Sequence, residues 1–111
     1  MTTRDAVSLV EIRTTFSSRD KAAACAADLV ARRLAACVQV DGPITSSYRW
    51  QDRIEMAEEF RCTCKTTQQA AEACIAALTC DHEYQTPEVI CTNVTSSAAY
   101  AAWVHANVGV E

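Results

Sequence analysis

Potential metal and proton ligands gather in one short stretch of the chain, Cys80-Asp81-His82-Glu83-Tyr84-Gln85-Thr86-Pro87-Glu88. Imidazole combined with carboxylate or thiolate suits a borderline transition metal such as Cu(II), Zn(II) or Ni(II) better than Mg(II) or Ca(II). The reference pKa of histidine is about 6.5, so His82 offers a nitrogen donor near neutral pH. The spacing is not that of a recognised metal motif. The residues alone therefore leave open a metal site and a polar connecting loop, in which Asp81 or Cys80 ends a helix and Pro87 begins a strand.

Cysteine use is unusual, with 7 cysteines among 111 residues. In a secreted domain that count would indicate a disulfide scaffold, but here the number is odd and no export signal is visible. No Cys-x-x-Cys pair occurs, so a structural zinc site or a thioredoxin-type motif has no support. Most of the cysteines fall inside apolar patterns, where a free thiol packs as a small hydrophobic side chain: Cys25, Cys37, Cys62, Cys64, Cys74 and Cys91. Cys62 and Cys64 are two apart on one predicted strand, so we expect them to share a core face.

Length and composition limit the class of protein. The chain has a formal net charge of −4, an isoelectric point of about 5.1 and a 50% apolar composition, which together predict one domain spanning residues 1–111. No apolar run approaches the roughly 20 residues that a membrane span requires. The first residues show neither a secretory signal nor a transit peptide, so we expect a cytoplasmic protein. Acidic charge and few aromatic residues argue against nucleic-acid partners.

Periodicity predicts the elements that position these residues. Strands are expected at residues 7–14, 37–50, 54–65 and 89–95, with Gly42-Pro43 marking a bulge or kink in the second. Helices are expected at 18–34, 67–79 and 98–107. Ser17 and Thr66 begin capping boxes before the first two helices, and Ser96 or Ser97 begins the third. The order β-α-β-β-α-β with a C-terminal helix predicts an α+β fold, the ferredoxin-like split βαβ sandwich.

The third strand is too long for a compact chain of this size. About 12 residues at roughly 3.3 Å each reach about 40 Å, whereas a compact protein of this length is only about 34 Å across. The distal end carries the apolar side chains Tyr48, Trp50, Ile54 and Met56. Such an overhang needs cover from another chain. We therefore expect a homo-oligomer assembled through this hairpin; the alternative is a shorter strand with a disordered tip.

Signals of catalysis or ligand binding are otherwise sparse. Two glycines in the whole chain cannot build a P-loop, a dinucleotide motif or a nucleophile elbow. Tyr48 and Trp50 are expected to anchor an interface or to line a small-molecule cleft. Lys65 is expected either to face an anion at the start of the following helix or to be a solvated strand end. His105, beside Trp103, is expected at the surface or in an interface.

Four short motifs resemble the CutA divalent-cation tolerance family. They are Leu34-Ala35-Ala36-Cys37, Ser47-Tyr48-Arg49-Trp50, Lys65-Thr66-Thr67 and His82-x-Tyr84-Gln85-Thr86-Pro87-Glu88. The similarity spans about residues 7–105. The resemblance implies a ferredoxin-like protomer in a tight homotrimer, akin to the PII signalling proteins. It also implies a cytoplasmic, non-enzymatic role in tolerance of copper and other divalent metals.

The resemblance also suggests site residues. His82 and Glu88 carry over as metal ligands, whereas the cysteine that many bacterial members have near the end of the first strand corresponds to Thr14. Cys80, which is outside the family pattern, could substitute as a thiolate donor. The family's His-Pro-Tyr is here His82-Glu83-Tyr84. An inter-subunit cleft for a metal, small molecule or anion is expected to involve these side chains: Tyr48, Trp50, Lys65, Tyr84 and Trp103.

Three functions follow as expectations. The first is a homotrimeric binding or signalling module of divalent-cation tolerance that binds copper or another divalent metal. The second is a trimeric interaction scaffold without a metal site. The third is a small acylphosphatase-like hydrolase, using Arg13 or Arg19 to hold phosphate and Asn93 to position water; it rests on fold analogy alone.

Overall fold

The fold follows the expected order of strands and helices. The computed structural model describes residues 7–109, which form these elements: β1 (Ser8–Phe16), α2 (Arg19–Ala31), β2 (Cys37–Trp50), β3 (Arg53–Thr66), α3 (Gln68–Cys80), β4 (Ile90–Thr95) and α4 (Ala98–Asn107). The α+β, ferredoxin-like split βαβ prediction is confirmed. No helix among these residues is long and apolar enough to cross a membrane.

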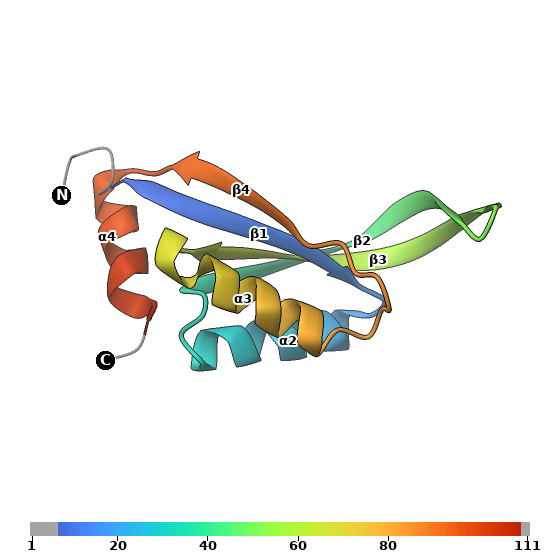
Figure 1. Cartoon of the computed structure of the whole chain (residues 1–111), viewed down its shortest axis with the longest axis horizontal. Coiled ribbons are helices and arrows are strands. Elements are labelled where there is room, and N and C mark those ends of the chain that lie inside the picture. Colours follow the sequence, from blue (N-terminus) through green and yellow to red (C-terminus); the bar gives the residue numbers. More distant parts are fainter. Residues whose placement is uncertain (1–6, 110–111) are drawn as a thin grey trace.

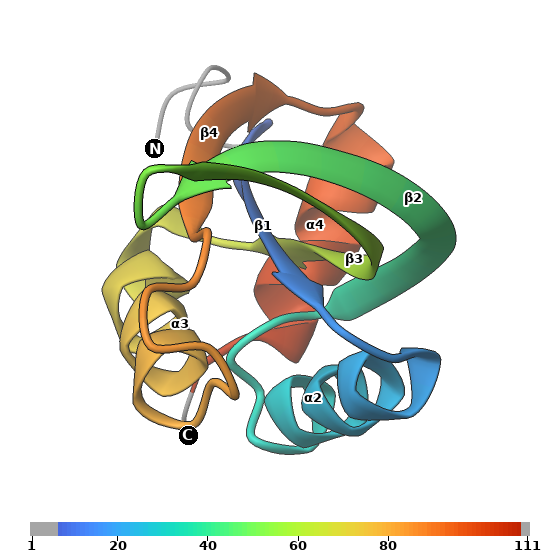
Figure 2. The same cartoon turned by 90° about the vertical axis from the view of Figure 1, so that its right-hand side faces the viewer.

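One antiparallel sheet carries the helices, and α4 lies at one end of it (Figure 1). Its strand order is β2-β3-β1-β4. Helices α2 and α3 lie side by side against one face (Figures 1 and 2). Because side chains alternate along β1, Val10 and Ile12 face these helices, while Leu9 faces the other way and packs against α4. The main core lies between the sheet and the α2–α3 layer, where Cys64, Cys74 and other apolar residues are buried.

Helix boundaries differ from the prediction by a few residues at the start and end of α2. Its N-cap is Ser18, whose side chain accepts from the backbone N–H of Lys21, and not Ser17. The helix ends at Ala31 because Arg33 adopts a left-handed φ of 59°. Asp28 and Arg32, four residues apart near the end of the helix, form an ion pair with a nitrogen-to-oxygen distance of 3.0 Å.

The N-cap of α3 is Thr67, so the prediction that Thr66 caps this helix is wrong. Thr66 is fully buried, and its hydroxyl donates to the carbonyl of Leu34 at 2.7 Å. Thr67 therefore caps α3 through the backbone N–H of Ala70. Ser97 caps α4, as one of the two predicted choices.

β2 and β3 form a long hairpin that bends once and ends in a tight turn. The pairing register shifts between Asp41 and Ile44, which confirms the bulge. Gly42 has a φ of +146°, and a Cβ there would lie 2.7 Å from the Cδ2 atom of Phe60. The turn contains two residues, Gln51 and Asp52, with φ values of 49° and 66°. Positive φ at both positions is typical of a type I′ hairpin turn, which matches the twist of the strands.

The far half of this hairpin leaves the rest of the sheet. β3 pairs with β1 only from residue 60 onwards, so residues 44–50 and 53–59, called the ribbon below, pair only with each other. The ribbon extends away from the helical layers (Figure 1), and the molecule measures 49 × 24 × 21 Å. Ile54 and Met56 are 72% and 71% exposed. The predicted apolar overhang is confirmed.

The cysteine predictions are correct in the core and wrong at the edge of the sheet. Cys62, Cys64 and Cys74 are buried, and Cys25 and Cys37 are partly buried. Cys91 is exposed, contrary to the prediction, because β4 is an edge strand with a sheet neighbour on one side only.

Candidate functional site

The ligand-rich loop, residues 81–89, packs across the free edge of β1. β4 pairs with β1 only as far as Arg13, so Thr14, Thr15 and Phe16 have β3 on one side and no strand on the other. The loop passes this end of β1 on its way from α3 to β4 (Figure 1). His82 contacts Thr14 on the helical side of the sheet, and the side chains of Thr15 and Tyr84 meet at a common acceptor on the opposite side.

Both ring nitrogens of His82 form hydrogen bonds. The backbone N–H of Tyr84 donates to Nδ1 at 3.0 Å, so the proton of the neutral ring is on Nε2, which lies 3.0 Å from the Thr14 hydroxyl. Phe16 stacks on the imidazole with ring centroids 4.4 Å apart and planes 8° apart. Burial lowers the pKa of His82, although a hydrogen bond to the Thr15 backbone and the charges of Glu83 and Glu59 oppose this effect. The ring is therefore held neutral.

Glu83 ties the loop to the start of α2. Its carboxylate accepts from the backbone N–H and the hydroxyl of Ser17, both at 2.7 Å, and from the Lys21 ammonium group at 3.0 Å. Burial raises the pKa of Glu83, but these hydrogen bonds and the charge of Lys21 outweigh burial, and the net pKa is lowered. Glu83 is thus an ionised carboxylate whose bonds to Ser17 and Lys21 hold the loop against the start of α2.

Tyr84 connects the same loop to the base of the ribbon. Its hydroxyl donates to Glu59 Oε2 at 2.9 Å, and the Thr15 hydroxyl donates to the same oxygen at 3.2 Å. Burial, together with the hydrogen bond and charge of Glu59, raises the pKa of Tyr84. The phenol therefore stays protonated and acts as a donor.

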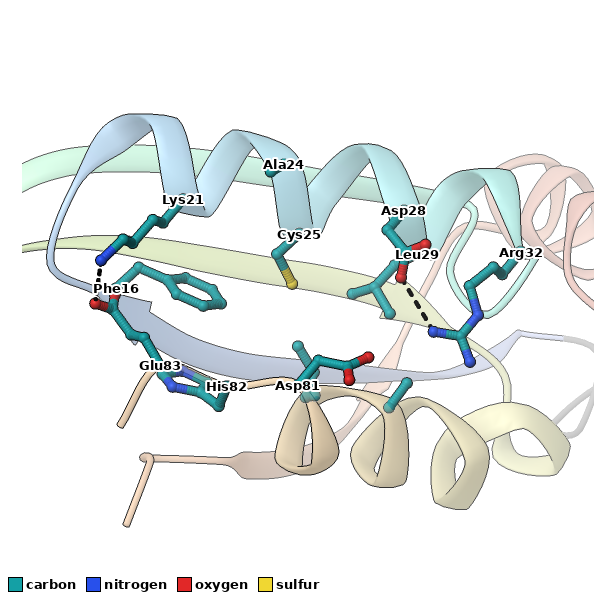
Figure 3. A pocket seen from close by; sticks show the side chains of 12 residues that line it. Phe16, Lys21, Ala24, Cys25, Asp28, Leu29, Arg32, Asp81, His82 and Glu83 are labelled. Carbon is teal, nitrogen blue, oxygen red and sulfur yellow. Dashed lines mark hydrogen bonds and ion pairs between the residues drawn. The ribbon is translucent and has the colours of Figure 1, made fainter. Parts of the chain in front are cut away.

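Two cavities flank the loop. The first, the helix groove, has a volume of about 680 Å³ and lies between α2 and the end of α3 (Figure 3); Cys25, His82 and Glu83 are among its lining residues. The second, the hairpin cavity, has a volume of about 850 Å³ between the ribbon and residues 83–88. Glu83 lines both cavities.

The structure brings together only some of the residues expected in a site. Four predicted residues line the hairpin cavity together: Tyr48, Trp50, Tyr84 and Glu88. The other two proposed metal ligands lie elsewhere, His82 in the helix groove and Cys80 exposed at the end of α3. Across residues 7–109, no three His, Cys, Asp or Glu side chains are grouped closely enough to hold a metal ion.

Lys65 and Trp103 lie outside both cavities. Lys65 forms an ion pair with Glu11 on the neighbouring strand, so its ammonium group does not serve an anion at the start of α3. Trp103 is exposed on α4, where its ring stacks with Tyr100 at 5.7 Å.

The residues suggested for a phosphate-hydrolysing site are engaged separately. Arg13 pairs with Glu11, and Arg19 donates to the carbonyl of Gly42 while its guanidinium lies 4.9 Å from the Phe60 ring centre. Asn93 accepts a hydrogen bond from Gln68. None of these contacts joins an arginine to Asn93, so the hydrolase alternative gains no support.

Comparison with known proteins identifies the family. The family model of the CutA1 divalent ion tolerance protein matches residues 10–107. The chain belongs to this family. A divalent-cation tolerance protein CutA from Escherichia coli is 35% identical over 84 residues, which cover 75% of each chain.

Solved structures of CutA proteins have the same fold. The CutA structure from Xylella fastidiosa is 31% identical with a TM-score of 0.88, and the alignment covers 91% of this chain and 98% of that one. A structure from Archaeoglobus fulgidus, described as a periplasmic divalent cation tolerance protein, is 27% identical with a TM-score of 0.87 and coverage of 91% and 99%.

Sequence reasoning missed several residues that hold the loop in place. Glu59 contacts Tyr84, and Phe16 contacts His82, each from a strand far away in sequence. No local sequence pattern indicates such contacts. The one available signal was the family position occupied here by Thr14, which the structure places in hydrogen-bonding contact with His82.

Proposed function

We propose that this chain is a homotrimeric, non-enzymatic binding protein of divalent-cation tolerance that works in the cytoplasm. Its ligand is copper or another divalent metal, bound where copies of the chain meet. The observation that carries this proposal is the exposed apolar ribbon beside the hairpin cavity. Membership of the CutA1 family supports the link to divalent cations.

The ribbon supports assembly because its apolar side chains are exposed in a single protomer. Tyr48, Trp50, Ile54 and Met56 are all exposed, and residues 44–50 and 53–59 have no third strand beside them. Covering one such side chain stabilises an assembly by about 1.5–3 kcal/mol. Two-stranded ribbons are marginal in water without further packing. A second and a third copy supply that packing.

The proposed metal ligands do not fit a cation within one protomer. Nδ1 of His82 accepts a hydrogen bond and Nε2 is protonated, so neither nitrogen has a free lone pair. Glu88 is exposed in the hairpin cavity, on the other side of the loop from the helix groove. A cation at Glu88 therefore needs donors from a second copy, which is why the proposal places the metal at a contact between copies.

Assembly and metal binding can be tested on the full chain. Sedimentation equilibrium at micromolar concentration should give three times the 12.1 kDa chain mass, and a single-chain mass would reject the assembly. Cu(II) titration calorimetry should then compare the wild type with Glu88→Gln and His82→Ala. The chain has 2 histidines, so His105→Ala is the matched control.

The proposal expects Glu88→Gln to weaken Cu(II) binding, whereas His82→Ala, whose ring nitrogens are both engaged inside the protomer, and His105→Ala should leave it unchanged. Isotherms identical to the wild type in Glu88→Gln would reject the inter-copy site. Wild-type protein that forms a trimer and shows no Cu(II) heat would favour the metal-free interaction scaffold instead. Turnover of an acyl phosphate by the trimer would contradict the non-enzymatic assignment.

A further inference from the structure

Four cysteines form two thiol pairs beneath α2 and α3. Cys25 of α2 packs against the buried cluster that contains Cys62 of β3, and Cys64 of β3 and Cys74 of α3 are buried together in the main core. Cys62, Cys64 and Cys74 are completely buried. Only Cys25 is partly exposed. The two pairs therefore have similar chemistry but different access to solvent.

The helix groove provides that access. Cys25 lines the groove, whereas none of the other three thiols of the two pairs does. Figure 3 shows its sulfur atom pointing from α2 into the groove, between Phe16 and Leu29. The volume of about 680 Å³ is large enough to admit a small molecule.

Close contact between α2 and β3 places the second thiol directly behind the first. The Cys62 thiol donates to the carbonyl of Ala22 at 3.4 Å, one helical turn before Cys25. Ala22 is fully buried, and its methyl side chain lets the helix approach the strand. Cys62 can thus reach Cys25 but cannot itself meet a molecule from solvent.

Different access to solvent makes the two sulfur atoms unequal, because Cys25 lines the groove and Cys62 is completely buried. The neighbouring Cys62 side chain lowers the pKa of Cys25, against burial and the charges of Asp28 and Asp81, while Cys25 and burial raise the pKa of Cys62. The thiolate is the nucleophile in exchange chemistry. An accessible thiol with a lowered pKa next to a second thiol is the arrangement of a redox-active cysteine and its resolving partner.

We propose that Cys25 and Cys62 form a thiol–disulfide exchange site whose substrates are small-molecule disulfides. The Cys25 thiolate attacks one sulfur of the disulfide RSSR, which forms a mixed disulfide and releases RS⁻, protonated by solvent. The Cys62 thiol then loses its proton and attacks the Cys25 sulfur. This step forms the Cys25–Cys62 disulfide and releases the second thiol, RSH. Two protein thiols are oxidised and one RSSR is reduced to two RSH.

The charges of the groove select among disulfides. Five charged residues line it, the cations Lys21 and Arg32 and the carboxylates of Asp28, Asp81 and Glu83, alongside the neutral His82. Carboxylates outnumber cations by one. The groove therefore favours a cationic disulfide such as cystamine over the anionic dithiodiglycolate.

The experiment uses the full chain with Cys80→Ser and Cys91→Ser, because both of these thiols are exposed and would react independently. The folded protein is treated with cystamine, alkylated and digested with trypsin. Cleavage after Lys21, Arg32, Arg61 and Lys65 releases peptides 22–32 and 62–65. The expected product is these two peptides joined by a disulfide, with loss of two of the five remaining thiols.

Two variants in this background distinguish the proposed pair from its buried neighbour. Cys64→Ala is the matched control, since Cys64 lies two residues from Cys62 on the same strand and is equally buried. It should leave the cross-link intact. Cys62→Ala should abolish the cross-link and leave Cys25 as a mixed disulfide with cysteamine. Circular dichroism verifies that both variants are folded.

Several results would overturn the proposal. One is a Cys25 thiol that reacts only after the protein is unfolded; another is a mixed disulfide at Cys25 that never resolves although Cys62 is present. A cross-link lost equally in Cys64→Ala would show that the pairing is not the one assigned. Equal rates with cystamine and dithiodiglycolate would contradict the charge selection. The assay contains no metal, so it is independent of the proposed cation site.

Discussion

Replacing Thr14 by valine should destabilise the protein by about 1 kcal/mol. Thr14 is completely buried, and its hydroxyl is a partner of His82 Nε2 at 3.0 Å. A buried donor left without a partner costs about 1–3 kcal/mol. The backbone of Thr15 also interacts with the ring, so we expect the lower end of this range. At roughly 4–8 °C per kcal/mol for a domain of about 100 residues, the melting temperature should fall by about 4 °C.

A double-mutant cycle isolates this contact. His82→Phe keeps an aromatic ring against Phe16 and removes the Nε2 donor, so Thr14→Val should cost almost nothing in that background. All four proteins should be unfolded in urea at pH 8 and at one protein concentration, because the proposed assembly would make stability concentration-dependent. Equal costs of Thr14→Val in the two backgrounds would refute the assigned hydrogen bond.

Three further outcomes follow from the same structure. Because burial lowers the pKa of His82 in the folded state, the unfolded state binds more protons, and stability should fall as the pH drops below about 6.5 towards the folded pKa. Urea midpoints between pH 8 and pH 5 test this, and a loss no smaller in His82→Phe would contradict it. Met56→Lys should weaken self-association, since Met56 is 71% exposed in one protomer and a lysine there costs the lone subunit less than about 0.5 kcal/mol. Unchanged dissociation on dilution in light scattering would exclude Met56 from the interface. Gly42→Ala should cost more than about 1 kcal/mol, because of the positive φ and the 2.7 Å approach to Phe60, and an unchanged thermal midpoint would contradict the bend.

The sequence predicted which helices and strands form, but it did not predict the exact residues that cap the helices. Apolar and polar residues alternate along β3, and apolar residues form a stripe along α3, because each element is buried on one face. The hydrophobic pattern therefore predicts whether the segment is a strand or a helix. Caps depend on the tertiary structure: Ser17 bonds to Glu83 and Thr66 bonds to Leu34, which leaves the next residue to cap each helix. Adjacent hydroxyl residues look equivalent until those partners are known.

The site was foreseen as a loop and not as a set of contacts. An inter-subunit cleft was expected to involve Tyr48, Trp50, Lys65, Tyr84 and Trp103. Tyr48, Trp50 and Tyr84 line the hairpin cavity of one chain, whereas Lys65 and Trp103 lie outside it. His82 was expected beside Glu88, but its backbone and ring bonds direct it to the other side of β1. A loop that crosses a strand edge separates neighbouring residues onto two faces, and spacing along the chain cannot show this.

Glu83 gives the two cavities a common wall. A cation in the hairpin cavity that draws this carboxylate towards itself must weaken its bonds to Ser17 and Lys21, which hold the first turn of the helix that carries Cys25. Thermodynamic linkage then runs both ways with equal free energy. The Glu83 side chain would then couple cation binding in the hairpin cavity to thiol chemistry in the helix groove, on opposite sides of β1.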